Sequence, residues 1–561
     1  MKLVIIGGVA GGMSAATRAR RLNEKAEIVV FEKGAYVSFA NCGLPYHLAG
    51  EIADRDALLL HTPESLARRS ALDVRINSEV TAINRDRKTV TVVGPEGEYE
   101  ESYDKLILAP GANAVVPPIP GIDHPAVSTL RTIPELDNVM ELAQEGLAKA
   151  NENRPARAVV VGAGFIGLEA VEALVHRGFE VELVELATHV LPMMDPDLAV
   201  ILHRELRDKG VGLHVGVGAK RFEDGEDYPV KVTLGDETVI EADLVITSIG
   251  VRPNSALAKA AGLELGKNDA IITDENQVTS DPDILAAGDA VQVKFSDGHE
   301  GTVMLAGPAN RQGRRAADTV MGHSVVKQQP VLGTAGLRLF DYVAASTGSN
   351  AETLDRLGVE YVKIHVHPVD HAGYYPGATP VHLNALFAKD GRLLGAQAVG
   401  KNGVERRIDI LSVAIRAGMT AEDLAELELT YSPPLGAAKD VVNMLGFVAM
   451  NTLNGDSPVW YYKDFDQVKE QEIILDVRPP EVIPPGGVIP EAIPVPIFEL
   501  RDRIEEVRAM AQGKCVALHC KTGLNSYLAQ RILQAEGFDT RNLVGGFDSF
   551  ELAKEASESS K

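Results

Sequence analysis

The sequence predicts an α/β protein with several domains, two of them with the Rossmann-like arrangement that binds dinucleotides. Two glycine-rich loops carry this prediction, because each follows a short apolar run (residues 2–6, KLVII, and 158–161, AVVV) and precedes a helical pattern. Strand-like and helix-like segments also alternate after residue 465, which predicts a smaller C-terminal α/β domain. At about 100–200 residues per domain, a chain of 561 residues allows roughly three to five domains.

Composition limits the partners and the compartment. Lys and Arg total 55 against 79 Asp and Glu, so the net charge of −24 repels nucleic acids and anionic membranes. The sequence starts without a leader-like segment and contains no apolar run of about 18–20 residues, which predicts a cytoplasmic protein. Cys42, Cys515 and Cys520 are too few for a disulfide framework and fit a reducing compartment. We expect no nucleic-acid partner, no membrane partner and no metal.

The first loop reads Gly7-Gly8-Val9-Ala10-Gly11-Gly12 and leads into the helical pattern SAATRARRL. Val9 replaces the middle glycine of GxGxxG, so a glycine turn without a ligand stays an alternative for the loop taken alone. The next strand, EIVVF, is followed by Glu32, whose carboxylate is placed to bind a ribose hydroxyl.

Two segments that are distant in the sequence are predicted to belong to the same domain as the first loop. Residues 106–112 (LILAPGA) and 283–291 (DILAAGDAV) are strands that run into glycine turns. Asp289 ends the second turn, where an acid can reach the ribityl chain of a flavin, although alone it would suggest a turn or N-cap residue. Together these segments predict a split domain. Its candidate cofactor-binding residues are Gly7, Gly8, Ala10, Gly11, Gly12, Glu32, Lys33, Gly111, Gly288 and Asp289.

The second loop is a full GxGxxG between a strand and a helix. The following strand, EVELVE, ends at Glu185, and no Arg or Lys follows in residues 186–188. A carboxylate there accepts hydrogen bonds from the ribose hydroxyls of NADH and repels the 2′-phosphate of NADPH, so the sequence favours NADH. The candidate residues are Gly162, Gly164, Phe165, Ile166, Gly167 and Glu185, with Gly250 in the return segment 247–255.

Two dinucleotide loops, the second inside the split first domain, resemble the two-dinucleotide-binding flavoprotein family of disulfide reductases. The resemblance implies that the first loop holds FAD, that the second holds the nicotinamide, and that an α+β dimerisation domain joins two chains into a homodimer. The implied boundaries are 1–120 and 245–325 for the FAD domain, 121–244 for the NAD(P)H domain and 326–450 for the dimerisation domain.

Cys42 is the candidate nucleophile. It lies in SFANCGLPY, and His47 occupies the position where many flavin disulfide reductases carry the second cysteine of CxxxxC. One cysteine cannot close an internal disulfide here, so it must form a mixed disulfide with a substrate thiol, a persulfide or a sulfenic acid. A turn at Asn41 followed by a helix predicts that the pKa of Cys42 is lowered.

The flanks of Cys42 resemble those of the coenzyme A-disulfide reductases. The resemblance implies that coenzyme A binds, with Ser38 and Asn41 contacting the pantetheine arm. It also implies that two tyrosines of the dimerisation domain, Tyr374 and Tyr431, donate protons or hydrogen bonds to a leaving thiolate. Arg18 and Arg21 would bind phosphates; a solvated helix face is the alternative for these arginines, and packing is the alternative for the tyrosines.

After a linker at 451–465, residues 466–561 predict the C-terminal α/β domain. EIILDVRPP and CVALHCKTGLNSYL resemble a rhodanese domain, and Cys520 takes the place of its nucleophile. The usual loop is CxxGxR; Gly523 is present, but Asn525 stands where the arginine is expected, and Lys521 can compensate only in part. Cys520 is therefore a candidate persulfide carrier, with a purely structural rhodanese fold as the alternative. Cys515 is expected in the core.

These features predict an enzyme that uses NADH and FAD to reduce coenzyme A persulfide, polysulfide or coenzyme A disulfide through Cys42. The rhodanese-like domain would exchange sulfane sulfur with that site. Two alternatives stay open: an NADH oxidase or peroxidase that works through a Cys42 sulfenic acid, and a redox sensor or persulfide carrier without turnover. The sequence leaves open the physiological sulfur substrate and the direction of sulfur flow.

Overall fold

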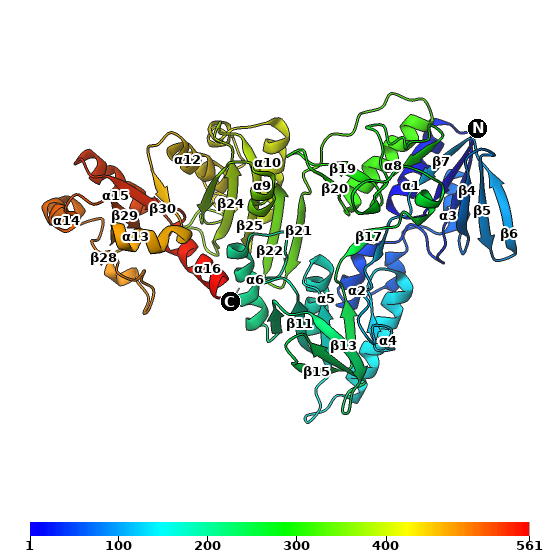
Figure 1. The fold of residues 1–561 in the computed structure, drawn as a ribbon, viewed down its shortest axis with the longest axis horizontal. Helices are drawn as coiled ribbons and strands as arrows, with labels where there is room; N and C mark the ends of the chain where they lie inside the picture. Colours follow the sequence, from blue (N-terminus) through cyan, green and yellow to red (C-terminus); the bar gives the residue numbers. More distant parts are fainter. Residues whose placement is uncertain (560–561) are drawn as a thin grey trace. The chain divides into compact units, whose positions relative to one another are not determined.

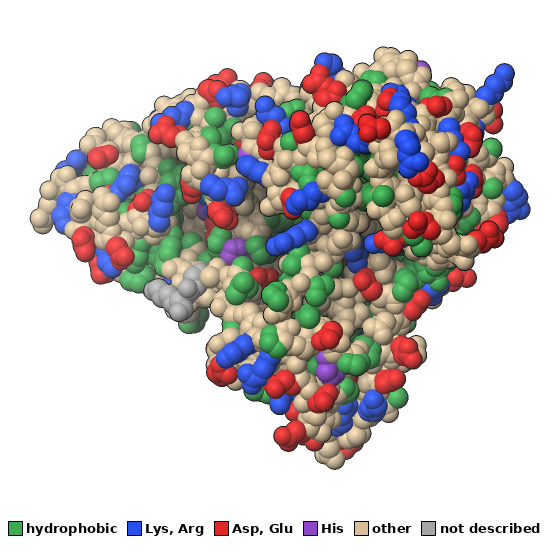
Figure 2. All heavy atoms as spheres, turned by 45° about the vertical axis from the view of Figure 1, so that its right-hand side comes forward, with side chains coloured by type: hydrophobic (Ala, Val, Ile, Leu, Met, Phe, Trp, Pro, Cys, Tyr) green, Lys and Arg blue, Asp and Glu red, His purple; other side chains and the backbone are tan. Residues whose placement is uncertain are grey.

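The computed structural model describes residues 1–559, which form two compact units (Figure 1). The first unit contains Met1–Val184 and Gly210–Gly333; the second contains Glu185–Lys209 and the described chain from Thr334 onward. No helix among these residues is long and apolar enough to cross a membrane. Figure 2 shows acidic and basic side chains interspersed over the face that it displays, so the net negative charge is not gathered in one patch there.

A five-stranded parallel sheet with the order β18-β7-β1-β2-β3 forms the first nucleotide-binding fold. Leu3, Val4 and Ile5 of its central strand are fully buried, as expected of an apolar run in a parallel sheet. Helices α1 and α8 lie side by side and pack on it (Figure 1). The elements are β1 (Lys2–Ile6), α1 (Ala10–Leu22), β2 (Glu27–Phe31), α3 (Pro63–Ser70), β3 (Asp73–Arg75), β7 (Lys105–Leu108), β18 (Ile284–Ala286) and α8 (Ala306–Val320).

Smaller elements surround this fold. They are η1 (Asn41–Gly43), α2 (Leu44–Leu48), the antiparallel sheet β4 (Glu79–Asn84), β5 (Thr89–Gly94) and β6 (Gly97–Ser102), and α7 (Ala256–Ala260). Two short antiparallel pairs also belong to the first unit: β8 (Ala112–Ala114) with β17 (Val251–Pro253), and β19 (Gln292–Lys294) with β20 (Glu300–Thr302).

The second nucleotide-binding fold has the strand order β12-β11-β10-β16-β9. The expected boundary between the NAD(P)H domain and the returning FAD domain, at residue 244, is too early. Leu244–Thr247 pairs in parallel with β10 and so belongs to this sheet. The elements are β9 (Val127–Ser128), α4 (Ile133–Lys149), β10 (Arg157–Val161), α5 (Phe165–His176), β11 (Glu180–Glu185), β12 (Gly212–Val215), β16 (Leu244–Thr247) and the antiparallel strands β13 (Ala219–Asp224), β14 (Val230–Leu234) and β15 (Val239–Ala242).

The second unit begins with an antiparallel sheet of order β21-β22-β25-β24-β23. One core unites its apolar face with residues from α10, α11 and α12. The buried ion pair of Arg407 with Asp440, 2.8 Å, joins α10 to the N-terminal cap of α12. The elements are α6 (Pro196–Asp208), β21 (Ala335–Leu339), β22 (Tyr342–Gly348), α9 (Ala351–Leu357), β23 (Val362–Val366), β24 (Val381–Phe387), β25 (Leu393–Gly400), α10 (Val404–Ala417), α11 (Ala421–Ala425) and α12 (Val441–Leu453).

The C-terminal parallel sheet has the order β26-β30-β29-β27-β28. The linker expected at 451–465 is wrong, because α12 extends to Leu453 and β26 already pairs with β30 in this sheet. Trp460 of β26 is fully buried in the core. The elements are β26 (Val459–Trp460), α13 (Phe465–Gln471), β27 (Ile473–Asp476), β28 (Ile493–Pro494), α14 (Ile504–Ala511), β29 (Val516–His519), α15 (Leu524–Ala535), β30 (Thr540–Leu543) and α16 (Gly546–Ser559). Residues 560 and 561 of the expected domain lie outside the described residues.

Candidate active sites

The first glycine loop makes a tight turn between β1 and α1. Gly7 has φ +101°, and a Cβ on Gly12 would lie 1.9 Å from the Gly7 carbonyl oxygen, so both positions require glycine. Glu32, just past the end of β2, accepts hydrogen bonds from the backbone N–H groups of Gly8 (2.9 Å) and Gly34 (2.8 Å). The loop, the helix N-terminus and the predicted acid therefore meet at the carboxyl edge of the sheet.

The second loop repeats this geometry. Gly162 has φ +103°, and a Cβ on Gly167 would lie 1.9 Å from the Gly162 oxygen and 2.6 Å from Ser248 Oγ. A Cβ on Gly164, the N-cap of α5, would meet no atom within 4 Å, so the backbone is open to a ligand there. Glu185 ends β11, and its Oε1 accepts a hydrogen bond from the Ala187 N–H at 2.7 Å.

Cys42 lies on the single turn η1 and is exposed to solvent. Its N–H donates to Asn41 Oδ1 at 3.1 Å. The expectation of a lowered pKa is wrong for this arrangement: although the residue is exposed, nearby protein atoms desolvate the thiol and raise its pKa, and Glu169 and Asp289 act in the same direction. Helix α2 spans only Leu44–Leu48, so it supplies a weak dipole against these effects.

The other predicted residues near Cys42 are held by their neighbours. His47 is buried and its Nδ1 lies 2.7 Å from the Ile52 carbonyl oxygen, which gives it a structural role. Ser38 has φ +48°, and its N–H donates to the Gly8 oxygen at 2.8 Å, which connects the cysteine segment to the first glycine loop. Arg18 Nε forms an ion pair with Asp318 at 2.6 Å, whereas Arg21 is exposed.

The second unit brings the two predicted tyrosines together. Tyr374 Oη lies 3.2 Å from Tyr431 Oη, and both side chains are exposed. This hydrogen bond raises the pKa of Tyr374, so the phenol stays protonated at neutral pH. The neighbouring Tyr375 points elsewhere, with its ring edge-on to His371 at 5.7 Å. Tyr374, and not the adjacent Tyr375, is therefore the tyrosine that pairs with Tyr431.

Cys520 follows β29 and begins the loop that leads into α15. Its Sγ is buried and accepts hydrogen bonds from the Gly523 N–H (3.2 Å) and from Ser526 Oγ (3.3 Å). Lys521 is exposed and pairs with Asp548 at 2.8 Å. Cys515 lies one residue before β29 and is half-buried; burial and Asp539 raise its pKa to about 12.

Comparisons with known proteins match these parts of the chain. The family model of pyridine nucleotide-disulphide oxidoreductases covers residues 1–313, the model of their dimerisation domain covers 334–441, and the rhodanese-like model covers 457–553. The chain belongs to the pyridine nucleotide-disulphide oxidoreductase family. It is a flavoprotein oxidoreductase with a rhodanese-like domain, and the rhodanese match begins inside the stretch that the sequence assigned to a linker.

Three proteins illustrate the similarity. A coenzyme A disulfide reductase of Staphylococcus epidermidis is 35% identical over 453 residues, 80% of this chain and 99% of that one. The reduced Bacillus anthracis protein called CoADR-RHD has a TM-score of 0.94 and 42% identity, over 99% of this chain and 98% of that chain. An NAD-dependent persulfide reductase from A. fulgidus has a TM-score of 0.90 and 36% identity, over 98% and 100%.

Membership of this oxidoreductase family implies FAD and NAD(P)H, and both loops fit these groups. Helices α1 and α5 begin without a side-chain cap, at Val9 and Gly164, whereas α4 begins with a capping box of Thr132 and Glu135. The first N–H groups of α1 and α5 are thus left for a pyrophosphate. Gly111 (φ +68°), Gly250 (φ +111°) and Gly288 (φ +88°) form left-handed turns of the same unit.

The structure also places polar residues near the predicted sites that the sequence prediction did not include. Helix α8 packs on α1 and brings Arg311, Arg314 and Arg315 to the same part of the first unit as Arg18 and Arg21. The sequence could have indicated these arginines, because residues 306–320 contain three of them soon after the Asp289 turn. Ser526, which donates to Cys520, was also missed, because the CxxGxR pattern ends one residue before it.

Proposed function

We propose that the protein is an NADH-dependent reductase of sulfur–sulfur bonds that works as a homodimer. Its substrates are coenzyme A persulfide, polysulfide and coenzyme A disulfide, attacked by Cys42. The observation that carries the proposal is one chain with an exposed, unpaired Cys42, a hydrogen-bonded Tyr374–Tyr431 pair and a second sulfur, Cys520, that accepts two hydrogen bonds. The similarity to a coenzyme A disulfide reductase and to a persulfide reductase supports it.

The proposed reaction starts when the Cys42 thiolate attacks the sulfur of coenzyme A persulfide that is bonded to carbon. The sulfur–sulfur bond breaks, a Cys42–coenzyme A disulfide forms, and hydrosulfide leaves. Two electrons and one proton then split this mixed disulfide into coenzyme A and the Cys42 thiolate. NADH and FAD supply these electrons when they are bound. The overall products are coenzyme A, hydrogen sulfide and NAD⁺, at the cost of one further proton.

The preference for NADH rests on Glu185. A carboxylate at the end of β11 accepts hydrogen bonds from ribose hydroxyls and repels a 2′-phosphate. Residues 186–188 are Leu, Ala and Thr, so no cation follows to bind that phosphate. Within the proposed function, Cys520 takes up sulfane sulfur, and Arg18, Arg21, Ser38 and Asn41 bind coenzyme A.

Anaerobic NADH oxidation with the three sulfur substrates in parallel tests the proposal. We expect coenzyme A persulfide and polysulfide to be reduced faster than coenzyme A disulfide, because the rhodanese-like domain serves sulfane sulfur. Cys520→Ser is expected to slow the reactions that use sulfane sulfur, from polysulfide or coenzyme A persulfide, and to leave the reduction of coenzyme A disulfide unchanged. Flavin reduction without sulfur-dependent turnover, followed by rapid oxidation in air, would identify an oxidase that uses a Cys42 sulfenic acid. A stable protein persulfide without turnover would identify a carrier.

Replacing Tyr374 with phenylalanine is expected to lower the sulfur-dependent rate about tenfold, and the double change with Tyr431→Phe about 100-fold. The reason is that one phenol still donates a hydrogen bond to the leaving thiolate when the other is lost, and general acids contribute factors of about 10²–10⁴. The measurement is kcat with coenzyme A persulfide. Tyr375→Phe is the matched control, since its ring faces His371, and equal losses in Tyr374→Phe and Tyr375→Phe would contradict the assignment.

A further inference from the structure

One short segment, Gly545–Ser549, lies between the Cys520 loop and the dimerisation domain. On one side it holds the Cys520 loop by its backbone: the Phe547 N–H donates to the Cys520 oxygen (2.8 Å) and the Asp548 N–H to the Lys521 oxygen (3.0 Å). A Cβ on Gly546 would lie 2.7 Å from the Cys520 oxygen. The position of the Cys520 loop therefore depends directly on the position of this segment.

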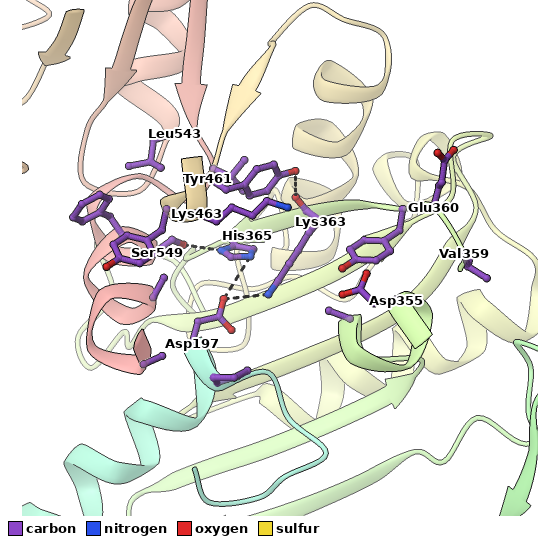
Figure 3. Close-up of a pocket in the computed structure, with 18 of the residues that line it drawn as sticks. Asp197, Asp355, Val359, Glu360, Lys363, His365, Tyr461, Lys463, Leu543 and Ser549 are labelled. Atoms are coloured by element: carbon purple, nitrogen blue, oxygen red, sulfur yellow. Dashed lines mark hydrogen bonds and ion pairs between the residues drawn. The ribbon is translucent and has the colours of Figure 1, made fainter. Parts of the chain in front are cut away.

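On its other side the segment contacts two histidines of the dimerisation domain. Ser549 Oγ lies 2.7 Å from His367 Nε2 and 3.1 Å from His365 Nδ1, and all three side chains are buried. Figure 3 shows Ser549 and His365 pointing toward each other across the wall of a pocket. A Cβ on Gly545 would come within 2.9 Å of both histidines, so the two domains meet here at closest packing.

Beyond Ser549 the hydrogen bonds continue on the His367 side, whereas His365 Nε2 has no hydrogen-bond partner among the described residues. His367 Nδ1 lies 2.9 Å from His382 Nδ1, and His365 Nε2 faces Asp197 Oδ2 at 3.6 Å (Figure 3). Burial lowers the pKa of both His365 and His367 well below the ordinary value, so the rings are neutral. With neutral rings the three contacts run in one direction: Ser549 donates to His365 Nδ1, His367 Nε2–H donates to Ser549, and His382 donates to His367.

We propose that His365 and His367 are positioning residues for Cys520: through Ser549 they fix the segment whose N–H groups hold the sulfur-carrying loop. The domain that joins the subunits thereby completes the rhodanese-like site. This inference rests on the proposed role of Cys520 as a sulfur acceptor. Removing one partner leaves a buried hydroxyl or ring nitrogen without its hydrogen bond, which costs free energy. We therefore expect the segment Gly545–Ser549 to shift when Ser549 or His367 is replaced.

Two measurements on the full-length holoenzyme test the inference. The first is sulfur uptake at Cys520 from inorganic polysulfide, followed by mass spectrometry. The second is hydrogen exchange of the backbone N–H groups of residues 520–526, which requires no sulfur chemistry. In Ser549→Ala we expect uptake to slow about tenfold and exchange to speed up about tenfold, because an unsatisfied buried polar group costs about that factor or more.

Conservative replacement separates positioning from folding. His367→Phe removes the ring nitrogen, whereas His367→Gln keeps a donor near the Nε2 position, so the glutamine variant should recover most of both rates. The control is His203→Gln, which changes another buried histidine of the same unit that accepts the Val190 N–H. Wild-type uptake and exchange in Ser549→Ala and His367→Phe would overturn the inference. Failure of wild-type Cys520 to take up sulfur would refute only the proposed function, since hydrogen exchange still decides the inference.

Discussion

Replacing Cys42 with serine is expected to reduce NADH oxidation by every sulfur substrate by at least about 10³-fold. A serine hydroxyl is almost entirely protonated at neutral pH, whereas a thiol supplies some thiolate even when burial, Glu169 and Asp289 raise its pKa. FAD should stay bound and NADH should still reduce it, because Cys42 belongs to neither glycine loop. The measurements are steady-state turnover with coenzyme A persulfide and anaerobic flavin reduction by NADH.

Two further cysteine variants make this result specific. Cys515→Ser changes a half-buried thiol before β29 and should leave turnover unchanged, whereas Cys520→Ser should affect only steps that need the rhodanese-like domain. The oxygen reaction is the decisive comparison. If Cys42→Ser kept its sulfur-dependent turnover, Cys42 would not be the nucleophile; if it lost only its reaction with oxygen, the enzyme would be an oxidase.

The nucleotide loops could be predicted because their constraints are local. In each loop the first and last glycines, Gly7 with Gly12 and Gly162 with Gly167, approach each other within one strand–turn–helix unit. Their spacing in the sequence is therefore enough to predict the contact. The tyrosine pair is different, because Tyr374 and Tyr431 are 57 residues apart. A family resemblance singled out both tyrosines, but only the structure shows that their hydroxyl groups lie 3.2 Å apart.

The failures share one cause, which is contact between distant segments. Val459 and Trp460 form too short an apolar run to indicate a strand, and only their pairing with β30 makes them one. The pKa of Cys42 was expected from its own turn, but it is raised first by desolvation from surrounding protein atoms and then by Glu169 and Asp289, which come from distant elements. Ser549 and His365 are 184 residues apart, and neither lies in a motif, so no sequence pattern announced their contact.

Two glycines of the second loop, Gly164 and Gly167, are expected to affect NADH binding for different reasons. Gly167→Ala is expected to weaken NADH binding about 100-fold or more, because its Cβ would overlap the Gly162 oxygen at 1.9 Å and force the loop open. FAD should remain bound through the first loop. The measurement is the NADH concentration that half-saturates flavin reduction, followed by stopped-flow absorbance.

Gly164→Ala is the matched variant, and it is expected to change NADH binding without changing the stability of the fold. Its Cβ meets no protein atom within 4 Å, and the N-cap backbone has φ −77°, which alanine adopts without strain. The melting temperature without NADH should therefore equal that of the wild type, while NADH affinity falls about tenfold, because the methyl group takes the space where a pyrophosphate approaches the α5 N-terminus. Unchanged affinity in Gly164→Ala would mean that the dinucleotide does not cross this loop. A loss of stability equal to that of Gly167→Ala would mean that both glycines serve only the fold.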